Sequence, residues 1–287
     1  MSAKRTLPQS APETRGGVLR RFVLGLAAGG FALLAGCATP AAPGSAETSK
    51  PATTADVGIY ELRIYSIAPG KTDALNARFR DHTIDLFKKH GMTPIAFFMP
   101  VTRAGQPADN RLFYLMGYKD RAARDDAWKA FAADPEWRKV FQESQADGSL
   151  TTKIENAFLT PAEYSMALDT KPAAKPRLFE LRTYKGMPGK LENIHQRFRD
   201  HTIEIFKNHA MTSMIYWRPV PGQPDLDGKM VYLLAFPDLA ARDAAWRAFA
   251  TDPEWQKVSE ESQRDGQLLD GAPVSVLLSP TDYSPLR

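Results

Sequence analysis

An internal repeat constrains the fold of this chain more than any other feature of its sequence. Three segments return about 119 residues later with little or no change: YELRIY at 60–65 as FELRTY at 179–184, RFRDHTI at 78–84 and 197–203, and DPEW at 134–137 and 252–255. This period is far longer than a solenoid unit and matches the length of a whole domain. The chain therefore contains a duplicated domain.

The composition between the repeats and before them sets the expected boundaries. Residues 38–56 consist almost entirely of Ala, Pro, Ser, Thr and Gly, so they cannot offset their ordering entropy by burial. A Pro/Ala/Lys stretch separates the two copies. We expect five segments: an export signal at 1–36, a flexible tether at 37–56, a first α+β domain at 57–167, a linker at 168–176 and a second α+β domain at 177–287.

Each copy has the pattern of a ferredoxin-like sandwich. In the first copy, hydrophobic periodicity predicts strands at 60–67, 95–101, 112–118 and 153–159, a helix at 71–90, and two further helices that begin after Asp120 and Asp134. The order β-α-β-β-α-β leaves one face of an antiparallel sheet without helices. Two copies can cover these faces for each other, which predicts a pseudo-dimeric α/β barrel within one chain. We therefore expect the part after the tether to be a monomer.

The single cysteine lies at the end of a candidate export signal. Arg20 and Arg21 precede a small, apolar run that ends in LAGC at 34–37. This run is shorter than the roughly 20 apolar residues that span a bilayer. The segment resembles a bacterial lipoprotein signal, which implies lipid attachment at Cys37, a position in the cell envelope and contact with a membrane. The paired arginines also resemble a twin-arginine signal, and Ala38 resembles the outer-membrane sorting pattern.

Charge and cysteine content exclude several functions. The net charge is +4, but residues 1–36 carry all of the excess, so the remainder is formally neutral. A basic surface for nucleic acid is therefore not expected. One cysteine excludes an intrachain disulfide framework and a cysteine-cluster metal site. We expect no metal and no cofactor.

The ordered motifs carry a family resemblance. YELR before Pro69-Gly70-Lys71, the helix with Phe79, His82 and His90-Gly91, the helix that begins near Arg124, and DPEW at 134–137 together resemble the NIPSNAP family. The resemblance covers nearly all of residues 57–284. It implies a dimeric α/β-barrel fold, in agreement with the pattern, but supplies no catalytic residues. One departure is Ala210, which stands where the first copy has Gly91.

The first strand of each copy supplies the candidate site. Alternation along residues 60–65 places the apolar side chains on one face and Glu61, Arg63 and Tyr65 on the other. We expect the apolar face to pack on the helices and the polar face to point into the barrel, together with its second-copy equivalents. Two interpretations stay open: ion pairs that hold the sheets in register, or the polar floor of a ligand cavity. The candidate ligand-binding residues are Glu61, Arg63, Tyr65, Glu180, Arg182 and Tyr184, with Tyr114, Tyr232, Trp217, Phe97 and Tyr216 as walls.

Other side chains have simpler interpretations. His82 and His201 are expected on the apolar stripe of their helices, where each is either a buried structural histidine or a candidate proton carrier. The repeated tryptophans at 128, 137, 246 and 255 are interpreted as core anchors. No histidine has the spacing of a zinc helix, and no serine has the glycines of a nucleophile elbow.

Three functional classes remain. The favoured one is an envelope-anchored, non-catalytic binding module for a small ligand or a protein partner. The second is a cofactor-independent oxygenase-like or haem-degrading enzyme, by analogy with other dimeric α/β barrels. The third is a purely structural interaction protein.

Overall fold

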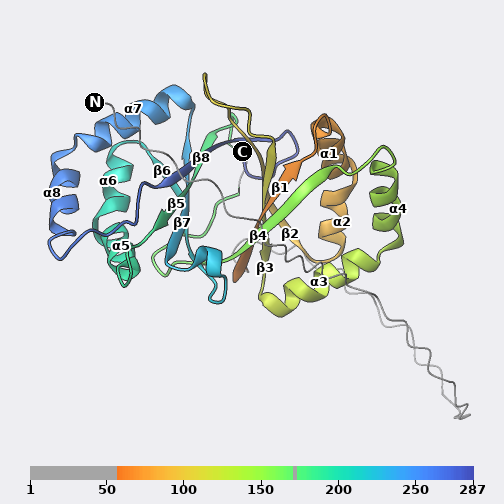
Figure 1. Ribbon diagram of the computed structural model, residues 1–287, viewed down its shortest axis with the longest axis horizontal. Coiled ribbons are helices and arrows are strands. Elements are labelled where there is room, and N and C mark those ends of the chain that lie inside the picture. The colour runs from red at the N-terminus through yellow and green to blue at the C-terminus, as the bar shows by residue number, and fades with distance from the viewer. Residues whose placement is uncertain (1–56, 171–172) are drawn as a thin grey trace, which may run out of the picture. The chain divides into compact units, whose positions relative to one another are not determined.

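The computed structural model of the chain describes residues 57–170 and 173–287 (Figure 1). The expected signal at 1–36, Cys37 and the tether at 37–56 lie outside the described residues. So do Lys171 and Pro172 of the expected linker. None of the described helices is long and apolar enough to cross a bilayer.

Both repeats have the predicted order of strands and helices. The first contains β1 (Ile59–Ile67), α1 (Thr72–Arg78), η2 (Phe79–Thr83), α2 (Ile84–Lys89), β2 (Thr93–Pro100), β3 (Arg111–Tyr118), α3 (Arg121–Ala133), α4 (Pro135–Ser144) and β4 (Thr151–Pro161). The second contains β5 (Leu178–Lys185), α5 (Leu191–Arg197), η3 (Phe198–Thr202), α6 (Ile203–Asn208), β6 (Thr212–Pro219), η4 (Pro224–Leu226), β7 (Lys229–Phe236), α7 (Leu239–Ala250), α8 (Pro253–Glu261) and β8 (Val274–Pro280).

The strands form one closed antiparallel barrel in the order β1-β3-β2-β8-β5-β7-β6-β4. Each repeat contributes four neighbouring strands, with its first strand inside its own sheet. Two short seams join the repeats. Phe98–Pro100 of β2 pairs with Leu278–Pro280 of β8, and Leu159–Pro161 of β4 pairs with Trp217–Pro219 of β6. The predicted pseudo-dimeric α/β barrel is therefore confirmed.

The helices of each repeat cover the outer face of its own sheet, so the strands lie between two groups of helices (Figure 1). Apolar side chains from both repeats fill the barrel interior, including Tyr60, Phe98, Phe179 and Trp217. The rings of Tyr60 and Trp217 meet edge to face across the repeats, with centroids 5.7 Å apart. Two further apolar clusters, one in each repeat, lie between the sheet of that repeat and its helices.

The alternation predicted for the first strand is present, but the predicted directions of its faces are wrong. Tyr60 and Leu62 point into the barrel, whereas Glu61 is hydrogen-bonded to α3 on the helix side. The barrel interior is lined by apolar side chains from both sheets, so it offers a charge few partners. Helix α3 supplies an arginine and a tryptophan that can satisfy the carboxylate. The polar face therefore points outward.

The predicted long helix at 71–90 contains a π-helical turn, η2, and the second repeat has the same turn as η3. Thr83 donates a hydrogen bond from its hydroxyl to the carbonyl of Arg78, at 3.0 Å. The wider turn shifts the phase of the side chains that follow. Thr83 is buried, while His82 and His201 are exposed. The prediction that these histidines lie on the apolar stripe is wrong.

The two predicted helix starts are confirmed. The Asp120 carboxylate accepts a hydrogen bond from the backbone N–H of Ala123 at 2.8 Å, and Asp134 does the same for Glu136 at 2.8 Å. Such caps satisfy backbone donors that have no partner within the helix. The Asp120 cap fixes the start of α3, the helix that carries two partners of Glu61, Arg124 and Trp128.

Candidate functional site

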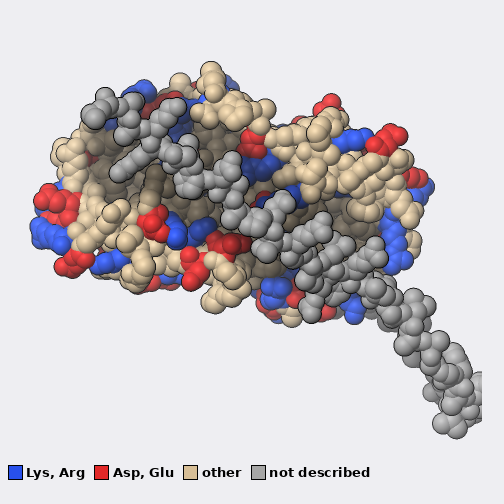
Figure 2. Space-filling model, in the orientation of Figure 1, with Lys and Arg blue, Asp and Glu red and all other residues tan. Residues whose placement is uncertain are grey.

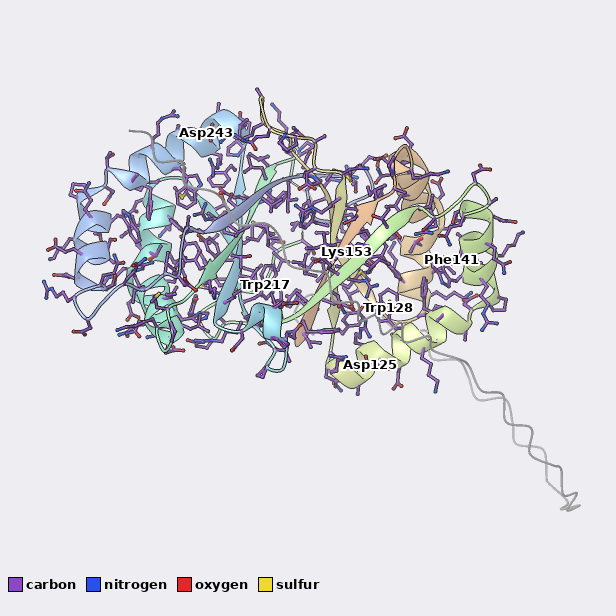
Figure 3. The ribbon with its side chains drawn as sticks, in the orientation of Figure 1. Asp125, Trp128, Phe141, Lys153, Trp217 and Asp243 are labelled. Carbon is purple, nitrogen blue, oxygen red and sulfur yellow. The ribbon has the colours of Figure 1, made fainter. Side chains whose placement is uncertain are left out.

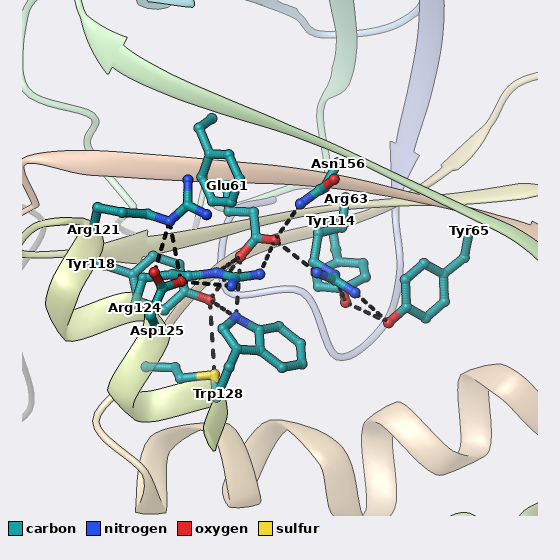
Figure 4. A network of polar contacts seen from close by, with 12 residues as sticks. Glu61, Arg63, Tyr65, Tyr114, Tyr118, Arg121, Arg124, Asp125, Trp128 and Asn156 are labelled. Carbon is teal, nitrogen blue, oxygen red and sulfur yellow. Dashed lines mark hydrogen bonds and ion pairs between the residues drawn. The ribbon is translucent and has the colours of Figure 1, made fainter. Parts of the chain in front are cut away.

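A fully buried carboxylate lies between the sheet and the helices of the first repeat (Figure 4). Glu61 accepts hydrogen bonds from Arg63 (2.7 Å), Arg124 (2.7 and 2.9 Å), Trp128 (3.1 Å), Asn156 (3.2 Å) and Tyr118 (3.4 Å). These donors come from β1, β3, α3 and β4. We call Glu61, Arg63, Tyr65, Tyr114, Tyr118, Arg124, Trp128 and Asn156 the first carboxylate network.

Two guanidinium groups keep Glu61 ionised. Burial pushes the pKa of its carboxyl group upward, but the hydrogen bonds and positive charges of Arg124 and Arg63 outweigh burial and lower the pKa. Arg124 binds both carboxylate oxygens, the bidentate geometry that gives the stronger ion pairs. Glu61 is therefore a fixed anion at neutral pH and not a proton donor.

Arg63 links the carboxylate to a pair of tyrosines. Its Nε donates to the Tyr114 hydroxyl at 2.7 Å, and its Nη2 lies 3.4 Å from the Tyr65 hydroxyl. Tyr114 in turn donates to Tyr65 at 2.9 Å. The Arg63 guanidinium also lies 4.4 Å from the Trp128 ring centroid, within cation–π distance. Burial raises the pKa of Tyr114 well above its ordinary value, so this hydroxyl stays protonated.

The second repeat builds the same arrangement around Glu180. Its carboxylate accepts hydrogen bonds from Arg182 (2.8 Å), Arg242 (2.6 and 2.9 Å), Trp246 (2.7 Å) and Ser275 (2.6 Å). Burial opposes ionisation, but these partners lower the pKa of Glu180 to about 2. We call Glu180, Arg182, Tyr184, Tyr232, Arg242, Trp246 and Ser275 the second carboxylate network. Phe236 stands where the first repeat has Tyr118, and Ser275 where it has Asn156.

The structure separates residues that the sequence placed together. The two carboxylate networks do not meet in the barrel, because β1 and β5 each turn their charged faces toward their own helices. Tyr114 and Tyr232 belong to the networks, whereas Trp217 lies in the barrel interior and in neither network. Trp217 and Trp128 lie on different elements and well apart (Figure 3). The prediction that the polar faces of both first strands form the floor of one ligand cavity in the barrel is wrong.

Sequence reasoning missed the helix side of each network. The sequence predicts Trp128 and Trp246 only as core anchors, yet their indole N–H groups bind the buried carboxylates. Arg124 and Arg242 precede them by four residues, so each pair lies on one face of its helix. This Arg/Trp pair in an alanine-rich helix, repeated in both copies, is the signal that could have identified them.

Each network reaches a groove beneath a loop of the other repeat. Asn156 and Phe158 of β4, with Arg121, lie under residues 220–226 and line the first groove, which holds about 330 Å³. Ser275 of β8 lies under residues 100–111 and lines the second groove, which holds about 560 Å³. A larger hollow of about 590 Å³ adjoins residues 218–229, but none of its lining residues belongs to either network.

Polar contacts tie each loop to the opposite repeat. The side-chain amide of Gln223 exchanges two hydrogen bonds with the backbone of Phe158, at 2.8 and 2.9 Å. Arg103 forms an ion pair with Asp243 in the N-terminal half of α7. Both grooves are therefore sites between the repeats, and neither repeat alone could form one.

The surface and the remaining titratable groups add little to the site. Acidic and basic side chains are interspersed on the face drawn in Figure 2. Among residues 57–170 and 173–287, no three histidine, cysteine or acidic side chains come together as metal ligands would.

Comparisons with known proteins identify the family. The NIPSNAP family model matches residues 60–166 and 179–285. An anthrone oxidase-like protein aligns with 82% of this chain and 96% of its own length, at a TM-score of 0.50 and 11% identity. An uncharacterized NIPSNAP-like domain protein from Burkholderia xenovorans aligns with 39% of this chain and 90% of its own, at a TM-score of 0.34 and 24% identity. A NIPSNAP family protein from Agrobacterium tumefaciens aligns with 39% and 96%, at a TM-score of 0.34 and 22% identity.

No curated protein matches the chain. The likeness to the anthrone oxidase-like protein, at 11% identity, shows a shared fold and says nothing of a shared activity. The family model, in contrast, spans both repeats and most of the chain. The chain belongs to the NIPSNAP family and carries two copies of its domain.

Proposed function

We propose that the chain is a non-catalytic binding module that holds a small ligand in the two grooves between its repeats. The observation that carries this proposal is the state of Glu61 and Glu180. Each carboxylate is saturated with donors and has a lowered pKa, so neither is suited to proton transfer near neutral pH.

The composition of the grooves supports binding. The second groove combines prolines and valines with a few polar groups, among them the Ser275 hydroxyl and the Arg103 guanidinium. Both volumes lie in the range usual for small-molecule sites, about 300–1,000 Å³. Asn156 and Ser275 each bind a buried carboxylate and line a groove, so a rigid network positions them. This is the arrangement expected of a preorganised recognition surface.

Neighbouring groups give a catalytic role no comparable support. The candidate proton carriers His82 and His201 are exposed and belong to neither network. Burial raises the pKa of Tyr114, Tyr118 and Tyr232 above their ordinary values, which leaves these hydroxyls neutral. The alternative, an oxygenase-like or haem-degrading enzyme, would need a group that titrates near the working pH or a bound cofactor.

Native mass spectrometry of the protein purified from its own cells tests the proposal. We expect a co-purified small molecule that the double variant Asn156→Leu with Ser275→Val loses. The matched control is the exchange Asn156→Ser with Ser275→Asn, which keeps a donor at both positions and should keep the ligand. A wild-type protein without any bound molecule contradicts the proposal. Oxygen uptake with a change in the ligand's mass would replace it with the enzyme alternative.

We also propose that a lipid at Cys37 anchors this module in the cell envelope, on the outer side of the cytoplasmic membrane. The support is the LAGC box at 34–37, the basic segment before it and the Ala/Pro/Ser-rich stretch after it. Metabolic labelling with a palmitate analogue should mark the wild type and not Cys37→Ala. Label on the variant would contradict the anchor. The double variant Arg20→Lys with Arg21→Lys tests export by the twin-arginine route separately.

A further inference from the structure

We propose that the second repeat holds a separate binding site for a small carboxylate, in a pocket between α5 and α8 with Arg197 at its base. The pocket has a volume of about 230 Å³. Its lining residues are Asn193, Gln196, Arg197, Asp200, His201, Val258, Glu261 and Ser262. None of them belongs to a carboxylate network or to a groove.

Arg197 is a buried cation without a counter-charge. Its side chain is 5% exposed, and its Nη1 lies 3.4 Å from the Ser262 hydroxyl. No carboxylate of the described residues forms an ion pair with it, and its Nε has no hydrogen-bond partner there. Burial lowers the pKa of this guanidinium. Because burying an unpaired charge is expensive, an anion beside Arg197 would be stabilised.

The first repeat contains the same arginine, equally buried, but two aromatic rings cover it. Arg78 lies over the rings of Trp137 at 5.5 Å and Phe141 at 5.7 Å, and its Nε also has no partner. Figure 3 shows Phe141 on α4. The second repeat keeps the tryptophan as Trp255 but replaces Phe141 with Ser259. This replacement removes the ring that covers the guanidinium.

A second difference makes the opened pocket polar. Ala74 and Ala77 of the first repeat correspond to Asn193 and Gln196 of the second, and both amides line the pocket. The Gln196 amide also interacts with the Asp200 carboxylate. Three side chains around the arginine therefore differ between the repeats. Ser259 replaces the ring of Phe141, and the amides of Asn193 and Gln196 replace the methyl groups of Ala74 and Ala77.

The lining indicates the class of ligand. A guanidinium and two amides offer several N–H donors, which suit an oxyanion. The Ser262 hydroxyl donates its own proton to the Ser259 carbonyl, at 3.1 Å. Asp200 and Glu261 at the rim are already paired, with Arg199 at 2.9 Å and Arg264 at 3.4 Å. Their charges oppose a doubly charged phosphate more than a singly charged carboxylate. The pocket therefore favours a small monocarboxylate.

The test is a titration of the full chain followed by the side-chain Nε–H resonances of arginine in NMR spectra. Sodium acetate, inorganic phosphate and sodium chloride are added in turn at constant ionic strength. Loss of one resonance in Arg197→Lys assigns the signal. We expect acetate to shift this signal in a saturable way, phosphate to bind about tenfold more weakly or worse, and chloride to cause no saturable shift.

Two matched variants decide whether the pocket is responsible. Ser259→Phe copies the first repeat and should abolish the response while the Arg197 resonance remains. Phe141→Ser with Ala74→Asn and Ala77→Gln should make the Arg78 resonance respond as well. An unchanged response in Ser259→Phe, equal effects of acetate and chloride, or tighter binding of phosphate would each overturn the proposal. Asn156→Leu with Ser275→Val should leave the acetate response intact, which separates this site from the grooves.

Discussion

Glu180 is a single residue on which five hydrogen bonds depend. We expect Glu180→Gln to lower the free energy of unfolding by about 3–5 kcal/mol at pH 7, because it leaves Arg182 without a counter-charge and leaves Arg242 with Asp243 alone. Urea denaturation measures this. The exposed Glu254→Gln is the control and should change stability by less than about 0.5 kcal/mol. Equal effects of the two substitutions would show that the buried ion pairs contribute nothing specific.

A second prediction at the residue scale concerns His195, which makes the folding stability depend on pH. It is fully buried, its Nδ1 lies 2.8 Å from the Tyr164 hydroxyl, and burial lowers its pKa to about 4. The unfolded chain protonates near 6.5, so this group's contribution to stability is complete above that pH and is lost as the pH falls toward 4.

The first repeat has Asn76 where the second has His195, bonded in the same way to Tyr283 at 2.6 Å. We therefore expect His195→Asn to remove about 2–3 kcal/mol of the loss in unfolding free energy between pH 7 and pH 4.5. Denaturation curves at both pH values, with the exposed His82→Asn as control, measure it. Parallel losses in wild type and His195→Asn would mean that other groups cause the acid sensitivity.

The alternation of side chains along the first strand predicts one part of the site and leaves another part unpredicted. It identifies Glu61, Arg63 and Tyr65 as one face of a strand, and the structure keeps them together. It does not say which face lies inside a barrel, because the pattern reads the same in both orientations. Arg124 and Trp128 are more than 60 residues away, so no local period connects them to Glu61.

At the scale of elements, the sequence predicted the strands and the helix starts but not the phase of the first helix. A 3.6-residue period places His82 inward, whereas the π-helical turn places Thr83 there. The identical RFRDHTI segments encode this turn in both repeats, and nothing in their composition distinguishes it from an ordinary helix.

The phase of this helix gives a prediction. We expect Thr83→Val to lower the free energy of unfolding by about 1 kcal/mol, because it removes a buried hydrogen bond to the Arg78 carbonyl. His82→Ala, at the neighbouring exposed position, should change it by less than about 0.5 kcal/mol. Chemical denaturation of both variants compares them. A larger loss of unfolding free energy in His82→Ala than in Thr83→Val would instead support the regular helix that the sequence predicted.

At the scale of the whole barrel, the repeats depend on each other through the interior more than through the seams. Each seam contains three paired residues, whereas the interior apolar cluster draws large side chains from both repeats. The repeat and the order of strands and helices together made this closure predictable, because that order leaves each sheet with one face without helices. The grooves were not predictable, since they arise from loops that cross to the opposite repeat.

A separated first repeat provides the last prediction. Residues 57–170 alone would expose the interior face of their sheet, including Tyr60 and Phe98, which are 2% and 4% exposed in the full barrel. An apolar patch of this kind promotes association. We expect two copies to close a symmetric barrel, with β4 of each beside β2 of the other, as β4 and β6 pair in the intact chain. Sedimentation should show a dimer or larger species for this fragment and a monomer for residues 57–287. A folded, monomeric fragment would mean that the helices and outer clusters suffice for stability, and that the second repeat serves chiefly to build the grooves.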